Sequence, residues 1–175
     1  MFLGVQMLAL AMKSEFDYDI DIKKVLFMLA IHEIGEAVIG DFTQFDISKE
    51  AKEKIERQAV HKILRDLLSG DEVEGLFLEF DEQKTPEAKF AYQCDKLEFD
   101  LQSKLYDEEG CVDLNNQPHN NAIKDKTVKG LLENGASFGE MCLSFGQQNY
   151  PYDENFRLVS NHALGHKIGR PRQRK

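Results

Sequence analysis

The sequence predicts an all-α fold, a helical bundle, on the basis of three observations. Apolar residues recur at helical spacing along most of the chain, whereas no stretch alternates apolar and polar residues over the length of a strand. Residues that favour helix starts, and glycines that favour helix ends, separate these periodic segments. The 175 residues are 42% hydrophobic and 30% charged, which is the balance of a globular chain with one core.

Five helices are expected before residue 110. Asp21, Ser48 and Thr85 are suited to cap three of them, because their side-chain oxygens can accept hydrogen bonds from the first turn of a helix. Gly40 and Gly70 are expected to end two of them. The expected ranges are 2–13, 22–39, 49–68, a short helix from 71 that includes Phe80, and 86–107.

After residue 110 the sequence predicts a loop, three shorter helices and a tail. Asn and Pro content indicates a loop at 111–122, and helices are expected at 124–133, 138–148 and 153–163. Five Lys or Arg residues follow Gly165 without apolar periodicity, which is typical of a flexible basic tail. The predicted organisation is a single helical domain, 1–163, followed by a tail, 164–175.

Charge and cysteine content exclude several classes of protein. The formal net charge of -9 argues against nucleic acid as a partner, because binding to phosphates needs a basic surface. Three widely spaced cysteines form no CxxC pair, which indicates reduced thiols in a cytoplasmic protein. The apolar segment 2–13 is too short to span a bilayer and has no basic residues before it, so we expect a core helix and no membrane partner; a signal-like segment is the alternative.

The stretch IHEIGEAVIGDFT, residues 31–43, places ionisable groups where the pattern calls for core. On a helical wheel His32, Glu33 and Glu36 fall within a sector of about 100° that also holds Val25 and Leu29. Burying charges without partners costs several kcal/mol, on the order of the stability of a small domain. A divalent cation is the simplest compensation.

A second acidic group is expected to face the core from the helix at 86–107. Asp95 falls in the arc of Ala88 and Ala91, away from the charged face that we assign to residues such as Lys96 and Asp100. His32, Glu33 and Asp95 can therefore converge on one metal ion, as side chains of helical bundles do. The alternatives are structural: a hydrogen-bonded core histidine, a capping role or a lysine partner for Glu33, and a salt bridge from Asp95 to an arginine.

Other catalytic motifs are incomplete or absent from the sequence. HEIGE is similar to the zinc-peptidase motif HExxH, but its fifth residue is Glu36 where that motif has a metal-binding histidine. Neither a phosphate-binding GxGxxG or P-loop sequence nor a Gly-x-Ser-x-Gly nucleophile motif is present.

The segments LFMLAIHEIGEAVIGDFT and TPEAKFAYQCDKLEF resemble two segments of the HD-domain metal-dependent phosphohydrolases, in particular the 5′-deoxynucleotidase-like branch. The first is similar to the family's apolar helix ending in His-Asp-x-x-Glu-x-x-x-Gly-Asp, and the second to the segment with the last metal-binding Asp. The resemblance covers residues 2–110 and implies an HD-domain-like helical bundle.

The resemblance also implies roles for five residues. His32, Glu33 and Asp95 stand at metal-ligand positions, Glu36 matches the acid that activates water, and Asp41 matches the acid near the substrate. One imidazole with two carboxylates suits a divalent ion such as Mn, Co, Mg, Fe or Zn. The implied reaction is hydrolysis of a phosphomonoester, with a nucleoside 5′-monophosphate as the small phosphorylated substrate.

Two departures from the family pattern leave alternatives open. Glu33 stands where the family has Asp, and the family's upstream metal-binding His would fall at or just before Met1. Either the start is shortened relative to the family, or the metal site has one ligand fewer. A catalytically silent HD-like protein that binds a nucleotide or dimerises is therefore the second hypothesis. The segment EGLFLEF, residues 74–80, is expected to expose phenylalanines that favour a homodimer.

Overall fold

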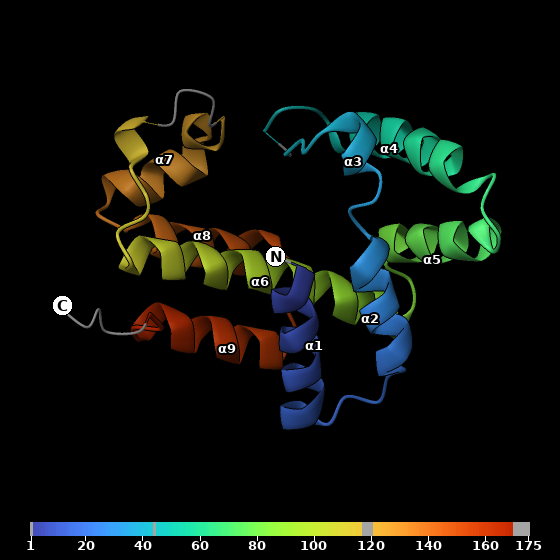
Figure 1. Ribbon diagram of the computed structural model, residues 1–175. Coiled ribbons are helices and arrows are strands. Elements are labelled where there is room, and N and C mark those ends of the chain that lie inside the picture. Colours follow the sequence, from blue (N-terminus) through green and yellow to red (C-terminus); the bar gives the residue numbers. More distant parts are fainter. Residues whose placement is uncertain (1, 44, 117–120, 170–175) are drawn as a thin grey trace, which may run out of the picture. The chain divides into compact units, whose positions relative to one another are not determined.

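The computed structural model describes residues 2–43, 45–116 and 121–169, and the described residues form helices and connecting segments without a strand. The all-α prediction is confirmed. Figure 1 follows the chain through its helices. Their bounds are α1 Phe2–Phe16, α2 Ile22–Ile31, α3 Glu36–Ile39, α4 Lys49–Leu64, α5 Gly70–Glu82, α6 Pro86–Glu108, η1 Leu114–Asn116, η2 Ala122–Lys124, α7 Lys126–Glu133, α8 Phe138–Asn149 and α9 Glu154–Gly165.

The expected caps are present. One carboxylate oxygen of Asp21 accepts from the backbone N–H groups of Lys23 and Lys24, and the hydroxyl of Ser48 accepts from the N–H of Ala51. The hydroxyl of Thr85 likewise accepts from the N–H of Ala88 in the first turn of α6. These local hydrogen bonds satisfy donors that have no partner within the helix.

Two expected helix bounds are wrong. The helix expected at 22–39 ends at Ile31, and four residues separate it from α3. The helix expected to reach residue 68 ends at Leu64, because the backbone of Gly70 lies directly against the Leu64 carbonyl, where any Cβ would overlap it. Only glycine permits such an approach, so Gly70 begins α5 rather than ending the preceding helix.

The backbone divides into two compact units, 1–94 and 95–175, and the division falls inside α6. The expected single domain of 1–163 stays a prediction. Residues 170–175 of the expected tail, and 117–120 of the expected loop, lie outside the described residues. Within the expected tail, the N–H groups of Ile168 and Gly169 donate to one carboxylate oxygen of Glu108, at 2.9 and 2.6 Å.

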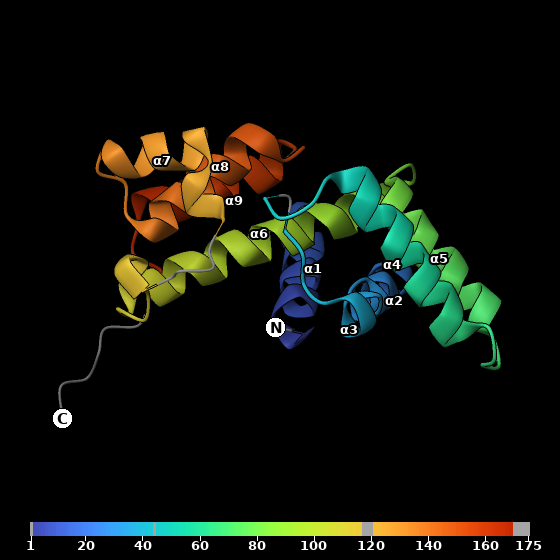
Figure 2. The same cartoon turned by 90° about the horizontal axis from the view of Figure 1, so that it is seen from above.

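In the first unit, α2 packs on α1 and α5, and α4 packs on α3 and α5. Arg57 pairs with Asp81 and His61 with Glu74, so α4 and α5 run antiparallel, as Figure 2 also shows. A hydrophobic cluster packs between these two helices. Its buried members are Val60, Leu64 and Phe77.

The burial of α5 overturns one expectation. Phe77 and Phe80 are 2% and 9% exposed, so the segment 74–80 does not present phenylalanines to a partner. Both rings lie on the face of α5 that packs inward, because their spacing of three residues places them on one side of the helix. The argument for a homodimer from this segment is therefore wrong.

Three hydrogen bonds connect the beginning of α2 to the residues around the beginning of α6. Glu79 of α5 accepts from Lys24 at 2.7 Å and from the hydroxyl of Thr85 at 2.6 Å. The N–H of Asp21 donates to a carboxylate oxygen of Glu87 at 3.1 Å. We call these three contacts the α2–α6 brace.

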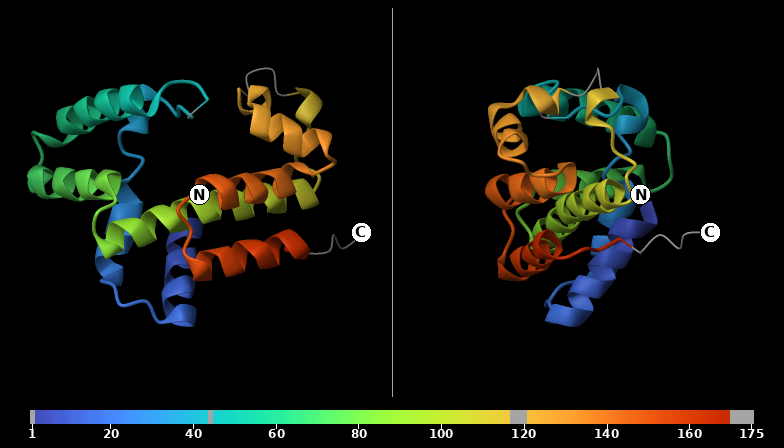
Figure 3. Two further views of the ribbon diagram at one scale, coloured as in Figure 1. Left: turned by 180° about the vertical axis from the view of Figure 1, so that it is seen from behind. Right: turned by 90° about the vertical axis from the view of Figure 1, so that its left-hand side faces the viewer.

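The second unit holds the remainder of α6 together with α7, α8 and α9 (Figure 3). Gly139 and Gly146 of α8 lie against Lys104 and Asp100 of α6, where a Cβ on either glycine would overlap them. Since residue numbers rise along α8 as they fall along α6, these two helices are antiparallel. Helix α8 also packs on α7 and α9. No helix in the described part of the chain combines the length and the apolar character that spanning a bilayer requires.

Candidate metal centre

His32 and Glu33 lie in a tight turn that separates α2 from α3. The N–H of Ile34 donates to the carbonyl of Ile31 at 2.9 Å, and the N–H of Glu36 donates to the carbonyl of Glu33 at 3.0 Å. These bonds span three residues, which is the 3₁₀ pattern common at helix ends. The expected helical wheel therefore holds through Ile31 and fails beyond it.

Gly35 is the point of this turn that lies closest to α4. It is buried, and a Cβ on it would overlap Cγ of Glu56 and lie 3.2 Å from a methyl of Val60, both on α4. The close approach of α4 to the backbone of the turn thus depends on a residue without a side chain.

The imidazole of His32 is held by its own helix. Its Nδ1 lies 2.9 Å from the carbonyl oxygen of Leu29, and the ring packs on Phe80 with centroids 5.2 Å apart. A carbonyl oxygen only accepts, so this contact assigns a proton to Nδ1, and in the neutral imidazole Nε2 then carries the lone pair. This is the arrangement of metal-binding histidines, whose second nitrogen donates to a protein oxygen.

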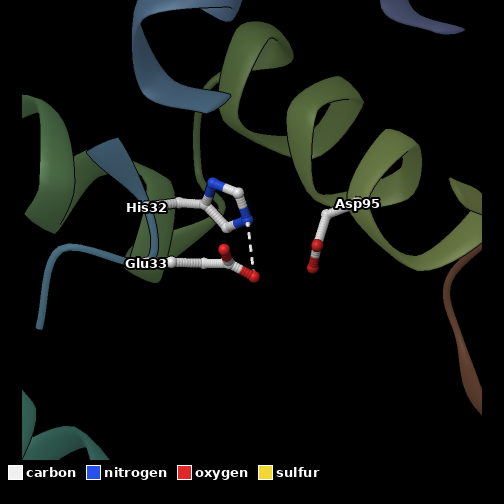
Figure 4. Close-up of side chains that lie close together, drawn as sticks. All are labelled: His32, Glu33 and Asp95. Atoms are coloured by element: carbon white, nitrogen blue, oxygen red, sulfur yellow. Dashed lines mark ion pairs between the residues drawn. The ribbon is translucent and has the colours of Figure 1, made fainter. Parts of the chain in front are cut away.

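Glu33 and Asp95 bring two carboxylates to the same place (Figure 4). One ligand atom from each of His32, Glu33 and Asp95 lies within 4.8 Å of the others, and Nε2 of His32 is 3.8 Å from an oxygen of Glu33. The His32 side chain is 9% exposed, whereas those of Glu33 and Asp95 are 34% and 21% exposed. Asp95 is the first residue past the division of the chain, on the unbroken helix α6.

The chemistry of these three groups fits a divalent metal ion. Ligand bonds of about 2.1 Å allow two donors to lie at most about 4.2 Å apart, so the side chains need to close by only a few tenths of an ångström. One imidazole and two carboxylates suit a borderline or hard cation, and three donors leave coordination positions for water and substrate.

Glu36 and Asp41 do not belong to this group. Oε1 of Glu36 accepts from Nζ of Lys52 on α4 at 2.7 Å, in a pair whose side chains are 20% and 27% exposed. Asp41 is exposed and follows Gly40, whose φ of 87° ends α3 as expected. Since the backbone turns before residue 36, Glu36 faces α4 rather than the sector assigned to it with His32.

Two residues near the centre were missed from the sequence. Glu56 is 8% exposed, and burial raises its pKa; His32 and Glu36 are among the charges that also act on this pKa. Its spacing from Ala59 and Val60 places it on the apolar face of α4, a signal that could have been used. The second is Lys96, whose Nζ lies 2.8 Å from Oδ2 of Asp95, although the helical wheel assigns it to the charged face of this helix.

Comparisons with known proteins identify the family of this chain. Residues 2–132 match the family model of the HD domain. The chain is 36% identical over 94 residues to 5′-deoxynucleotidase HDDC2 of Dictyostelium discoideum and 34% identical over 98 residues to 5′-deoxynucleotidase hdd1 of Schizosaccharomyces pombe, each time covering 52% of this chain and 50% of the relative. It is 35% identical over 82 residues to 5′-deoxynucleotidase HDDC2 of Homo sapiens, covering 45% and 40%.

The matched part therefore spans about half the length of these curated relatives. The match to the family model runs from residue 2 to residue 132 and includes the turn at residues 32–35 as well as Asp95. That match takes in well over half of the chain, and the protein belongs to the HD domain family.

Proposed function

We propose that this chain is a metal-dependent phosphomonoester hydrolase that acts on nucleoside 5′-monophosphates. The observation that carries the proposal is the convergence of His32, Glu33 and Asp95 within 4.8 Å in a chain of the HD domain family. The names of the relatives, 5′-deoxynucleotidases, supply the substrate class.

His32, Glu33 and Asp95 would hold the divalent ion, which when bound polarises the phosphoryl group and the attacking water. The Nδ1 contact to Leu29 keeps Nε2 of His32 aimed at the carboxylates. Because the donors come from two segments far apart in the sequence, the centre forms only when α2 and α6 are both folded.

Glu36 is the residue that we assign to proton transfer from the attacking water. Its Oε1 accepts from Nζ of Lys52 at 2.7 Å, so in this role the carboxylate would accept the proton of the water on Oε2, after turning from α4 toward the centre. The water oxygen forms the new bond to phosphorus, the bond to the 5′ oxygen of the nucleoside breaks, and solvent supplies the proton to that oxygen. Asp41, exposed beyond Gly40, is assigned to a hydroxyl of the sugar.

The test compares phosphate release by the chain and by Glu36→Gln across nucleoside mono-, di- and triphosphates with Mn²⁺, Co²⁺ or Mg²⁺. We expect turnover of monophosphates, its loss in Glu36→Gln, and an unchanged metal content in that variant. Glu72→Gln makes the same change at an exposed position of α5 and should keep full activity. Full activity of Glu36→Gln would overturn the assignment of Glu36.

The same experiment separates the second hypothesis. A chain that binds the metal and a nucleotide but releases no phosphate would be a silent HD-like protein. Failure to bind a stoichiometric metal ion would refute the role of His32, Glu33 and Asp95 as ligands.

A further inference from the structure

A pair of histidines lies at the end of the last helix of the second unit. His162 is in the last turn of α9, and His166 is the residue that ends this helix. Their imidazole rings are stacked, with centroids 4.2 Å apart and planes inclined by 14°. Both residues are exposed, so the rings are open to a ligand from solution. The pair lies beyond the end of the family match at residue 132.

The spacing of this pair is one that metal sites use. Residues 162–166 read HALGH, with the second histidine four positions after the first. Side chains at this spacing share one face of a helix, and two such histidines bind the metal ion in the zinc-peptidase motif HExxH. The stretch HEIGE at 32–36 lacks the second histidine, whereas HALGH has both. Because Ala163 stands where the peptidase motif has glutamate, HALGH offers two metal ligands without a general base.

His166 is oriented for coordination by its own helix. Its Nδ1 lies 2.9 Å from the carbonyl oxygen of His162, and since a carbonyl oxygen only accepts, this contact assigns a proton to Nδ1. In the neutral imidazole the lone pair is then on Nε2. A protein oxygen at one ring nitrogen and a metal ion at the other is the usual arrangement of metal-binding histidines. The contact keeps the ring beside that of His162, although the backbone at His166 is already extended.

The distance between the two rings suits one shared ion. Two nitrogen ligands with bonds of about 2.1 Å lie about 3.4 Å apart around a tetrahedral ion. Rings with centroids 4.2 Å apart can bring two nitrogens to that separation by rotating about their side-chain bonds, out of the stacked arrangement. Their exposure leaves room for this rotation. Imidazole ligands favour Zn²⁺, Ni²⁺ or Cu²⁺ over Mg²⁺ or Mn²⁺, which prefer oxygen ligands.

We propose that His162 and His166 bind Zn²⁺ or a divalent ion of the same preference, with water completing its coordination. The ion would cross-link the last turn of α9 to the residue that ends it. His166 stands two residues before Ile168, whose N–H donates to a carboxylate oxygen of Glu108 on α6 at 2.9 Å. The N–H of Gly169 donates to the same oxygen. Binding would therefore also strengthen the attachment of this segment to α6. The inference is independent of the proposed function, which uses other residues.

Nuclear magnetic resonance of the full isotope-labelled chain tests the site, with Zn²⁺ alone as the probe. Each imidazole gives its own nitrogen signals, so binding here is distinguished from binding at His32. The signals of His162 and His166 should shift together and saturate at one common dissociation constant. Amide hydrogen exchange at Ile168 and Gly169 should slow when Zn²⁺ is bound.

Single substitutions separate a shared ion from two independent imidazoles. His166→Gln should weaken Zn²⁺ binding at His162 about a hundredfold, because two ligands on one scaffold bind far more tightly than one. His162→Gln should weaken binding at His166 equally. Both positions are exposed, so the fold should tolerate either change. His61→Gln removes an exposed imidazole from α4 and should leave the Zn²⁺ affinity of His162 unchanged.

Three results would overturn the inference. The first is no response of either histidine to Zn²⁺, and the second is a different dissociation constant for each. The third is an unchanged affinity of His162 in the His166→Gln variant. A chain that binds Zn²⁺ at His162 and His166 but not at His32 would support this inference and refute the proposed ligands of the candidate metal centre.

Discussion

The buried carboxyl group of Asp100 is expected to make the free energy of unfolding of this chain depend on pH. Its side chain is 1% exposed in the second unit, where burial raises its pKa from 3.8 to about 7, against the opposing effects of the Tyr152 hydroxyl and of Lys96. The folded chain therefore binds the Asp100 proton more tightly than the unfolded chain does. This contribution to stability is fully present below pH 3.8 and is lost as the pH rises through about 7.

The size of the effect follows from the shift. A change from 3.8 to about 7 corresponds to about 4 kcal/mol between the two extremes of pH, and about 2.5 kcal/mol of it falls between pH 5 and pH 8. Asp100→Asn has nearly the same shape, has no charge at either pH, and keeps an oxygen that can accept from the Tyr152 hydroxyl. Its stability relative to the natural chain should therefore increase by about 2.5 kcal/mol from pH 5 to pH 8.

Urea unfolding followed by circular dichroism at the two pH values measures this difference. Asp66→Asn, at a side chain that is 81% exposed, should show a difference that does not change with pH. The reasoning is refuted if the Asp100→Asn difference is the same at pH 5 and pH 8, or if it changes in the opposite direction.

Two further perturbations test the turn and the metal centre. Gly35→Ala should lower the free energy of unfolding by about 1–3 kcal/mol, because the added Cβ overlaps Cγ of Glu56. The loss should be smaller in a chain that also carries Glu56→Ala, since the overlapping atom is then absent. Urea unfolding measures both losses, and equal losses with and without Glu56→Ala would contradict this contact. Mn²⁺ at about one hundred times its dissociation constant should stabilise the chain by about 2.7 kcal/mol, and chelation should remove the gain. Thermal unfolding of Asp95→Asn with and without Mn²⁺ should show little such gain, and an undiminished gain would place the ion elsewhere.

Local rules made much of the fold predictable. The caps at Asp21, Ser48 and Thr85 were found correctly because a short polar side chain bonds to backbone only two or three residues away. The ends of α2 and α4 could not be found in this way. Close approaches of Gly35 to Glu56 and of Gly70 to Leu64 lie just after these ends, and the hydrophobic period of the sequence does not encode such contacts.

The same distinction explains which parts of the site were placed well. His32 and Glu33 directly follow the last turn of α2, so an ideal helix still gives the approximate direction of their side chains. The structure brings both side chains close to Asp95. Glu36 comes three residues later, after the turn, and pairs with Lys52 instead. Whether these residues act as proposed remains a prediction.

The sequence predicts Asp100 on the charged face of the helix, because charged residues recur along that side of α6. The structure buries it, since Gly146 lets α8 approach its carboxyl group closely. A glycine in one helix thus decided the environment of an acid in another, and only the packing of the two helices reveals it.

The α2–α6 brace has a consequence for insertions and deletions. It fixes the first turns of both helices, and His32 and Asp95 each follow at a set number of residues from it. One residue added or lost between Asp21 and His32, or between Glu87 and Asp95, would rotate the predicted ligand that follows by about 100° and shift it by about 1.5 Å along the helix. We therefore expect length changes among natural relatives to avoid these two intervals. The segment between Gly40 and Ser48 follows His32 and Glu33 in the sequence and is free of that requirement.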